Sequence, residues 1–163
     1  MQIHRSRVIG VLAAASILLG SYAVAHARGK ARQSRDLVVR KALRFAKKRP
    51  LKALKILKAG NALDNNALMK VLAKNHNYTA GHSNRVGKYS FLIAKQMGLS
   101  KSKVAQVHRH GLLHDMGKLL TPKQILDKPG RLDDREFTRM RRHSGDGAAM
   151  LRGLFGRNAK AAT

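Results

Sequence analysis

The chain has 163 residues, room for one modest domain, and its 34 lysines and arginines against eight acidic residues give a formal net charge of +26 that attracts phosphate-bearing partners. It contains no cysteine, which excludes disulfide frameworks, zinc–thiolate sites and cysteine nucleophiles, so any bound metal must use histidine and carboxylate ligands. Tryptophan is absent and aromatic residues are few, so nucleic acid is a possible but not a favoured partner, because single-strand recognition relies on exposed aromatic faces.

An apolar N-terminal segment opens the chain. Residues 8–25 form an uncharged run of 18, preceded by Arg5 and Arg7 and followed by Ala25-His26-Ala27, which is similar to a small-residue cleavage site. Three interpretations are open: an uncleaved membrane anchor, a cleaved export signal, or a buried helix of a soluble domain. The run is longer than a signal-peptide core of about 7 to 15 residues, and the dense positive charge behind it favours a cytoplasmic C-terminal part. We therefore expect an inner-membrane protein with a cytoplasmic domain, and a periplasmic or secreted domain after signal cleavage is the alternative.

A strongly basic region follows this segment. Between Arg28 and Lys74 the sequence has 15 lysines and arginines against two aspartates, a net charge of +13. One interpretation is a solvated polar face on ordinary helices. The other is an anionic membrane surface as partner, where each basic side chain contributes about 1 kcal/mol.

Three short helices are predicted in the basic region. Apolar residues at steps of three and four between residues 39 and 46 predict the first, which ends before Pro50 because proline disfavours helix in the residue before it. The second covers residues 51–58 and ends at Gly60 as a left-handed cap. The third starts after Asp64 and runs through residues 68–72.

Two histidines lie on apolar stripes of predicted helices. His82 recurs with four apolar residues at helical spacing: Val86, Tyr89, Ile93 and Met97. His114 shares a second stripe, which contains Val104, Val107, Gly111 and Lys118. A lone histidine there is usually a core residue. Two inward histidines, one followed by Asp115 within an apolar helix, favour a shared metal ion, because a buried carboxylate needs a charged or metal partner.

A third helical segment follows a proline–glycine turn at Pro129-Gly130. Asp133 and Glu136 have the spacing of an acidic capping box, so we assign Glu136, the only glutamate, to a helix start and not to a general base. One helix is predicted to carry five residues inward: Phe137, Met140, Ser144, Ala148 and Leu151. His143 borders this stripe.

These segments together resemble the HD-GYP domain family. The matching motifs are Tyr78-Thr79, His82-Ser83, Arg85-Val86, Leu113-His114-Asp115-Met116-Gly117-Lys118, Lys128-Pro129-Gly130, Leu132, Glu136 and His143, in one order and spacing over about residues 64–151. The resemblance implies an all-helical domain in which His82, His114, Asp115 and His143 coordinate metal while Lys118 reaches substrate phosphate. Members of the family use metal ions to activate a water that cleaves the phosphodiester of cyclic di-GMP.

The chemistry of these residue types agrees with that implication. Imidazole and carboxylate ligands suit iron, manganese or zinc, and we expect a divalent transition metal, iron or manganese in preference to zinc, in unknown number. Lys118, four residues beyond His114, can neutralise charge on a phosphoryl oxygen. Asp115 and Lys118 are therefore the candidate catalytic residues.

The sequence also departs from the family pattern. After His143 the family continues with paired histidines, a glycine–tyrosine–proline segment and a further acidic ligand, none of which is present in this sequence. The positions shortly before His82 hold Tyr78 and His76 instead of an acidic ligand. His110 is assigned to the surface or core and His108 to solvent. We expect four ligands that hold one ion, or part of a pair.

The prediction is an all-α fold, a truncated HD-type helical bundle behind an N-terminal hydrophobic helix. Its parts are a hydrophobic segment (1–27), a basic helical connection (28–62), a partial HD-GYP-like domain (63–155) and a C-terminal tail (156–163). The predicted function is a metal-dependent phosphohydrolase of a cyclic dinucleotide, cyclic di-GMP, truncated or impaired. The alternative is a catalytically inactive membrane-associated module that binds an anionic nucleotide, nucleic acid or lipid surface.

Overall fold

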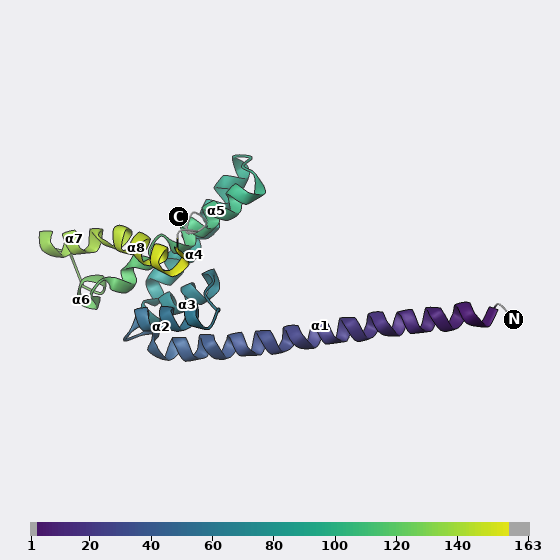
Figure 1. The fold of residues 1–163 in the computed structure, drawn as a ribbon. Helices are drawn as coiled ribbons and strands as arrows, with labels where there is room; N and C mark the ends of the chain where they lie inside the picture. Colours follow the sequence, from purple (N-terminus) through teal and green to yellow (C-terminus); the bar gives the residue numbers. More distant parts are fainter. Residues whose placement is uncertain (1–2, 157–163) are drawn as a thin grey trace. The chain divides into compact units, whose positions relative to one another are not determined.

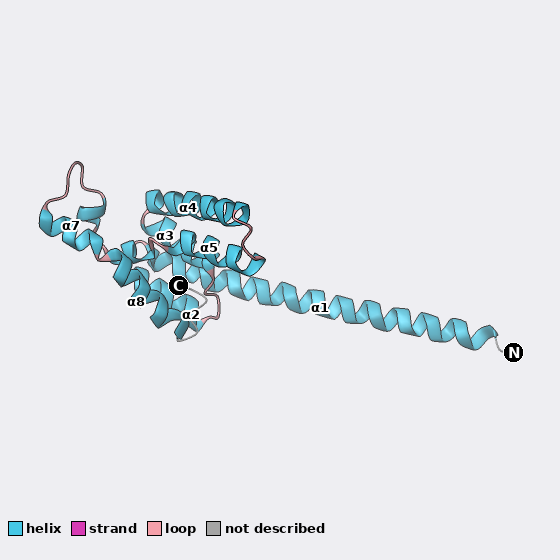
Figure 2. Ribbon diagram, turned by 90° about the horizontal axis from the view of Figure 1, so that it is seen from above, coloured by secondary structure: helices cyan, strands magenta, loops and turns pink. Residues whose placement is uncertain are grey.

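The computed structural model describes the backbone of residues 3–156 and the side chains of residues 21 and 23–156. The described residues form eight α-helices and one 3₁₀ helix and contain no strand (Figures 1 and 2). In chain order the elements are α1 (Ile3–Ala46), α2 (Pro50–Ala59), α3 (Asn65–Asn75), α4 (Asn77–Gln96), α5 (Lys101–Leu113), η1 (Met116–Leu120), α6 (Lys123–Leu126), α7 (Asp134–Arg141) and α8 (His143–Phe155). The all-α prediction is confirmed. The predicted C-terminal tail lies outside the described residues apart from Gly156.

The apolar segment and the first basic helix belong to one element. α1 is continuous over 44 residues, because its sequence contains no proline to stop it before the turn that leads to Pro50. The prediction of a short separate helix around residues 39–46 is therefore wrong. The chain divides into two compact units between Leu37 and Val38.

The predicted inner-membrane location is contradicted by the structure. Among the described residues, no helix is both long enough and apolar enough to cross a membrane. The described side chains between residues 21 and 37 are all exposed, and Arg28, Lys30 and Arg32 occupy alternate positions. The export alternative concerned the same apolar run, whose side chains from 8 to 20 lie outside the described residues.

One apolar core holds the second unit together. Its largest fully buried apolar side chains are Leu54, Leu57, Leu68, Val71, Leu72 and Met116. The end of α1 adds Ala42 and Ala46, and α8 adds Leu151. Each fully buried leucine contributes about 1.5–3 kcal/mol relative to an exposed one. The core therefore joins α2 and α3 to the segments that carry the histidines.

A side chain of α3 holds the turn between α1 and α2. Nδ2 of Asn75 donates to the carbonyl oxygens of Ala46 at 3.1 Å and Lys47 at 3.2 Å, which are among the unpaired carbonyls of a helix end. Pro50 occupies the first position of α2, where a missing N–H has no cost. The predicted helix over residues 51–58 is confirmed within α2.

The connection from α2 to α3 differs from the prediction at one residue. Gly60 is not left-handed, with φ −88°, whereas Asn61 takes that conformation with φ 50°, which asparagine tolerates. Glycine is required at position 60 for space, since a Cβ there would lie 2.4 Å from Cγ1 of Val38. The predicted start of the next helix is confirmed, because the side chain of Asp64 accepts a hydrogen bond from the N–H of Ala67 at 2.7 Å.

Small residues bring α4 and α5 side by side (Figure 2). A Cβ on Gly111 would lie 2.9 Å from Cα of Gly87, and a Cβ on Gly87 would lie 2.8 Å from the side chain of Leu112. The buried positions of α4 are accordingly small: Thr79, Ala80, Ser83, Gly87 and Ala94. This face of α4 fixes the distance between the two helices that carry His82 and His114.

The predicted apolar stripe of α4 faces solvent instead of the core. Tyr89, Ile93 and Met97 are 59%, 61% and 68% exposed. That prediction is wrong because close backbone approach selects the small residues for the interface. The stripe on α5 is partly confirmed, since Val104 and Gly111 are buried.

The last predicted helix is two helices, α7 and α8, which meet at Arg142. The capping box of Asp133 and Glu136 is confirmed at the start of α7. Phe137 is 54% exposed, so its predicted inward position is wrong, while Leu151 is buried as predicted. The break lets α8 begin at His143.

Glu136 generates a pH prediction. The hydrogen bond from Lys128 is the main cause that lowers the pKa of Glu136, and the backbone N–H of Asp133 adds to it. A depressed folded-state pKa stabilises the fold above the unfolded value, and this contribution is lost as pH falls through the folded pKa. Glu136→Gln should therefore lower the melting temperature at neutral pH, and the difference from wild type should shrink as the pH falls through the lowered pKa of Glu136.

Asp134→Asn is the matched control for this measurement. It removes a charge from the same first turn of α7 but leaves the Lys128–Glu136 pair intact. Thermal unfolding followed by circular dichroism across pH compares the three proteins. Equal losses for both variants at neutral pH would show that helix-end charge, and not the pair with Lys128, accounts for the effect.

Candidate metal centre

Asp115 lies in the turn that joins α5 to η1. α5 ends at Leu113, His114 is its C-terminal cap, and Asp115 precedes the first residue of η1. The prediction placed Asp115 inside a helix, and the structure corrects this. The turn directs the carboxylate inward, and Asp115 is 2% exposed.

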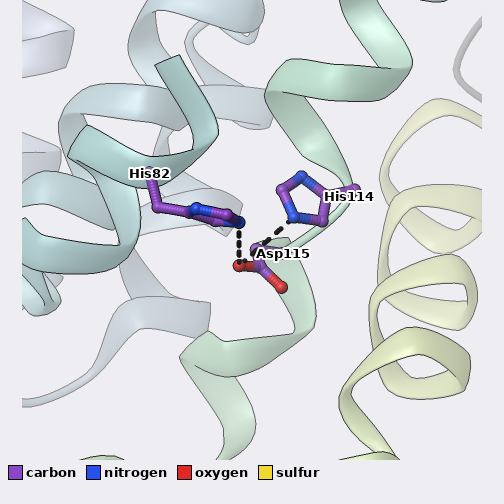
Figure 3. A group of neighbouring side chains, drawn as sticks. All are labelled: His82, His114 and Asp115. Carbon is purple, nitrogen blue, oxygen red and sulfur yellow. Dashed lines mark ion pairs between the residues drawn. The ribbon is translucent and has the colours of Figure 1, made fainter. Parts of the chain in front are cut away.

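Four side chains surround this carboxylate. Oδ2 of Asp115 lies 3.9 Å from Nε2 of His82, 3.4 Å from Nε2 of His114 and 2.8 Å from Nζ of Lys118 (Figure 3 shows the two histidines). Oδ1 lies 3.4 Å from Nε2 of His143. The structure thus brings the sequence-predicted residues together from α4, α5, η1 and α8, and the carboxylate presents its two oxygens to different histidines.

Backbone carbonyls orient two of the three histidine rings. Nδ1 of His114 lies 2.9 Å from the carbonyl oxygen of Gly111, and Nδ1 of His143 lies 2.6 Å from that of Met140. A carbonyl oxygen only accepts, so each Nδ1 carries the proton and the Nε2 of a neutral ring presents its lone pair. These lone pairs face the carboxylate of Asp115. Two facing acceptors repel unless the ring is protonated or a cation lies with them.

The donor set fits a divalent metal ion. One atom each of His82, His114 and Asp115 lie within 4.8 Å of one another, and imidazole nitrogen with carboxylate oxygen suits transition metals. The carbonyls behind His114 and His143 hold the rings in the tautomer that a metal ligand needs. Among the described residues, this is the group with the geometry of a cation site.

A close approach between glycines places His143 beside Asp115. A Cβ on Gly117 would lie 1.8 Å from the carbonyl oxygen of His143 and 2.6 Å from the N of Gly147. η1 and the first turn of α8 therefore touch through backbone. In the sequence, Gly117 stands out only as a member of the motif from Leu113 to Lys118. The available signal was a second glycine, Gly147, four residues after His143.

The remaining histidines of the described unit have other surroundings. His108, predicted to face solvent, is half-buried and packs edge-on against Phe91 with ring centroids 5.9 Å apart. Burial, followed by repulsion from Arg109 and Lys103, lowers the pKa of His110, and its buried Nε2 has no hydrogen-bond partner among the described residues. His110 is thus half-buried, between the surface and the core places predicted for it.

His76 has a structural part that the sequence did not reveal. Its Nε2 lies 2.7 Å from Oδ1 of Asp127, and its Nδ1 accepts from the N–H of Thr79 at 3.3 Å. One imidazole therefore caps the start of α4 and ties it to the segment after α6. This fixes the helix on which His82 stands.

Comparison with known proteins adds a family to this geometry. The sequence profile of the HD domain matches residues 79–162. A 3′3′-cGAMP-specific phosphodiesterase of Vibrio cholerae is 44% identical over 78 residues, which are 48% of this chain and 17% of that protein. A cyclic di-GMP phosphodiesterase of Pseudomonas aeruginosa is 42% identical over 88 residues, 53% of this chain and 21% of that protein. A cyclic di-GMP phosphodiesterase of Thermotoga maritima is 41% identical over 73 residues, 45% of this chain and 20% of that protein.

The chain therefore spans about a fifth of the length of these relatives. No solved structure matches it significantly. The matched residues include His82, His114, Asp115 and His143 within the HD domain range.

The geometry predicts that metal affinity depends on the Asp115 charge. Asp115→Asn keeps the shape of the side chain but removes the anionic ligand, and binding of Mn²⁺ should weaken at least about 100-fold. His108→Gln removes a histidine outside the group and should leave affinity within about twofold. Calorimetric titration of the chelator-treated chain measures both. Equal affinity in wild type and Asp115→Asn would contradict the metal assignment.

The glycine contact predicts a second effect at a distance. Gly117→Ala has no space for its methyl group against His143, so α8 must move and withdraw Nε2 of His143 from Asp115. We expect a loss of stability of about 2–4 kcal/mol, as for other overpacked or strained sites, and a change in the NMR signals of the His143 ring. Gly145→Ala, with open space at its Cβ, is the control. An unchanged His143 signal in Gly117→Ala would refute the positioning role.

Proposed function

Because the chain belongs to the HD domain family, we propose that it is a divalent-metal-dependent phosphohydrolase whose substrate is a cyclic dinucleotide. The observation that carries the proposal is the arrangement of His82, His114 and Asp115 with Lys118 at its edge. Nitrogen and oxygen donors, a buried carboxylate and a flanking ammonium group form the combination that phosphate ester hydrolysis requires. The names of the similar phosphodiesterases suggest the substrate class.

Iron or manganese is the metal we propose, in preference to zinc. Residues His82, His114, Asp115 and, at the second carboxylate oxygen, His143 would hold it. When bound, the metal would supply Lewis-acid polarisation of a phosphoryl oxygen and of water near neutral pH.

Lys118 has a defined task in this mechanism. Its Nζ lies 2.8 Å from Asp115 and its side chain is 22% exposed, so its charge acts in a partly water-excluded setting where it is worth more than at the surface. The i,i+3 position on η1 keeps the ammonium group at the edge of the metal group. A diester phosphate that enters from solvent would meet this ammonium, which offsets negative charge that grows on its oxygens during hydrolysis.

Asp115 and the histidines have positioning tasks of their own. Lys118, His82 and His114 all lie next to Oδ2 of the Asp115 carboxylate, while His143 lies next to Oδ1. The backbone carbonyls of Gly111 and Met140 fix two rings against rotation. Preorganisation of this kind removes the cost of ordering the site when substrate arrives.

A second candidate is a binding module without turnover. The observation in its favour is the ion pair of Asp115 with Lys118, which already supplies the buried carboxylate with a cation. An anionic nucleotide would then be held by the basic surface alone. The predicted anionic membrane surface and nucleic acid partners have no support among the described residues, and the predicted division at residues 28, 63 and 156 stays a prediction, as does impaired activity.

Hydrolysis of cyclic di-GMP by the full chain loaded with Mn²⁺ or Fe²⁺ distinguishes the candidates. Turnover that Asp115→Asn abolishes would support the hydrolase. Lys118→Gln should lower kcat about 100-fold or more with metal content unchanged, since it removes one transition-state charge contact. Binding of cyclic di-GMP with no product, in metal-loaded wild type, would replace the hydrolase with the binding module.

A further inference from the structure

A cavity lies in the second unit, apart from the metal group. Its volume is about 480 Å³, within the range of small-molecule sites. It opens between the turn after α1, the end of α3 and the segment after η1. Its polar lining comes from Lys47, Lys48, Asn75, Thr121, Lys123 and Gln124.

The charge of this lining has one sign. Three lysines line the cavity and no acidic side chain does. Among the described residues, none of the three ammonium groups forms an ion pair. Like charges that converge on one cavity repel, and a bound anion offsets that repulsion. Of the remaining polar groups, the amide of Gln124 and the hydroxyl of Thr121 can donate hydrogen bonds to an anion, whereas both N–H groups of the Asn75 amide already donate to Ala46 and Lys47.

The lining is built on ordered backbone. Asn75 holds the turn that carries Lys47 and Lys48 through its two hydrogen bonds to Ala46 and Lys47. Thr121 is 8% exposed, and its N–H donates to the carbonyl of Lys118 at 3.1 Å. Two walls of the cavity are therefore fixed before a ligand arrives.

The cavity and the metal group use opposite ends of η1. Asp115 precedes this helix and Thr121 follows it. Lys118 directs its ammonium group to Asp115, whereas Leu119 and Thr121 line the cavity. Lys47, Lys48 and Asn75 also lie outside the HD domain range of residues 79–162. The cavity is thus distinct from the proposed catalytic site.

We propose that this cavity binds the phosphate group of a small molecule no larger than a mononucleotide. Lys47, Lys48 and Lys123 supply the charge, Thr121 and the amide of Gln124 supply hydrogen bonds, and Pro50 and Leu119 offer apolar surface to the remainder of the ligand. The proposal does not depend on hydrolase activity. A free phosphate and a phosphate monoester share the recognised chemistry.

Titration of the chelator-treated full chain with inorganic phosphate and, separately, with guanosine 5′-monophosphate tests the proposal. The side-chain amide signals of Asn75 and Gln124 should shift in ¹H–¹⁵N spectra of wild type with at least one of the two. Tighter binding of the nucleotide would identify contacts beyond the phosphate, and equal affinity would identify the phosphate alone as the ligand. No shift of either amide with either probe would overturn the proposal.

Two triple variants that remove equal charge show whether binding depends on the cavity or only on the strong net charge of the chain. Lys47→Gln, Lys48→Gln and Lys123→Gln combined should weaken binding about tenfold or more. Lys88→Gln, Lys95→Gln and Lys101→Gln combined remove equal charge from exposed positions of α4 and α5 and should stay within about twofold of wild type. Equal weakening in both triple variants, or loss of binding in Lys118→Gln, would overturn the proposal, since binding would then follow net charge or the metal group.

Discussion

Burial of the Asp115 carboxylate constrains everything around it. A side chain that is 2% exposed cannot keep its charge without cations or hydrogen-bond donors, because the loss of hydration costs several kcal/mol. Lys118 supplies a cation at 2.8 Å, and the Nε2 atoms of three histidines lie 3.4–3.9 Å from the carboxylate, where a shared metal ion would bind both kinds of donor atom. His82, His114, Lys118 and His143 come from α4, the end of α5, η1 and α8. These four elements must therefore pack against one another before the carboxylate can be buried.

Glycines allow these elements to pack so closely. Two glycine pairs, Gly87 with Gly111 and Gly117 with Gly147, bring backbones closer than any side chain would permit. The first pair sets the spacing of the helices that bear His82 and His114, and the second sets His143 against Asp115. Because a packed interior does not deform smoothly, these contacts define the size of the site more strictly than the apolar core does.

The sequence predicted the chemistry of the site better than its scaffold. Residue types and spacing were enough for the all-α fold and for the expectation that His82, His114 and Asp115 lie together, whereas His143 and Lys118 were added by the family resemblance. The prediction that the apolar stripe of α4 faces the core was wrong, because Tyr89, Ile93 and Met97 have helical spacing yet face solvent. Periodicity detects a face by size and hydrophobicity, whereas this interface is selected by the absence of side chains. The break at Arg142 and the turn at Asp115 likewise depend on tertiary contacts that no local pattern contains.

The small number of acidic residues also sets Asp115 apart from the other carboxylates. In a chain of net charge +26, six of the eight carboxylates take part in a helix cap or an ion pair. Asp64 caps α3, Asp133 caps α7, and three others form ion pairs: Asp127 with His76, Glu136 with Lys128, and Asp146 with Arg139. These pairs are at least partly exposed, and their contributions are individually small. Asp115 alone among the described carboxylates is buried, and it stands where histidine nitrogens face it with their lone pairs. The chain has few carboxylates, and the one that is buried lies beside histidine side chains that can bind a metal ion. Asp115 and these histidines are therefore the best candidates for a cation site among the described residues.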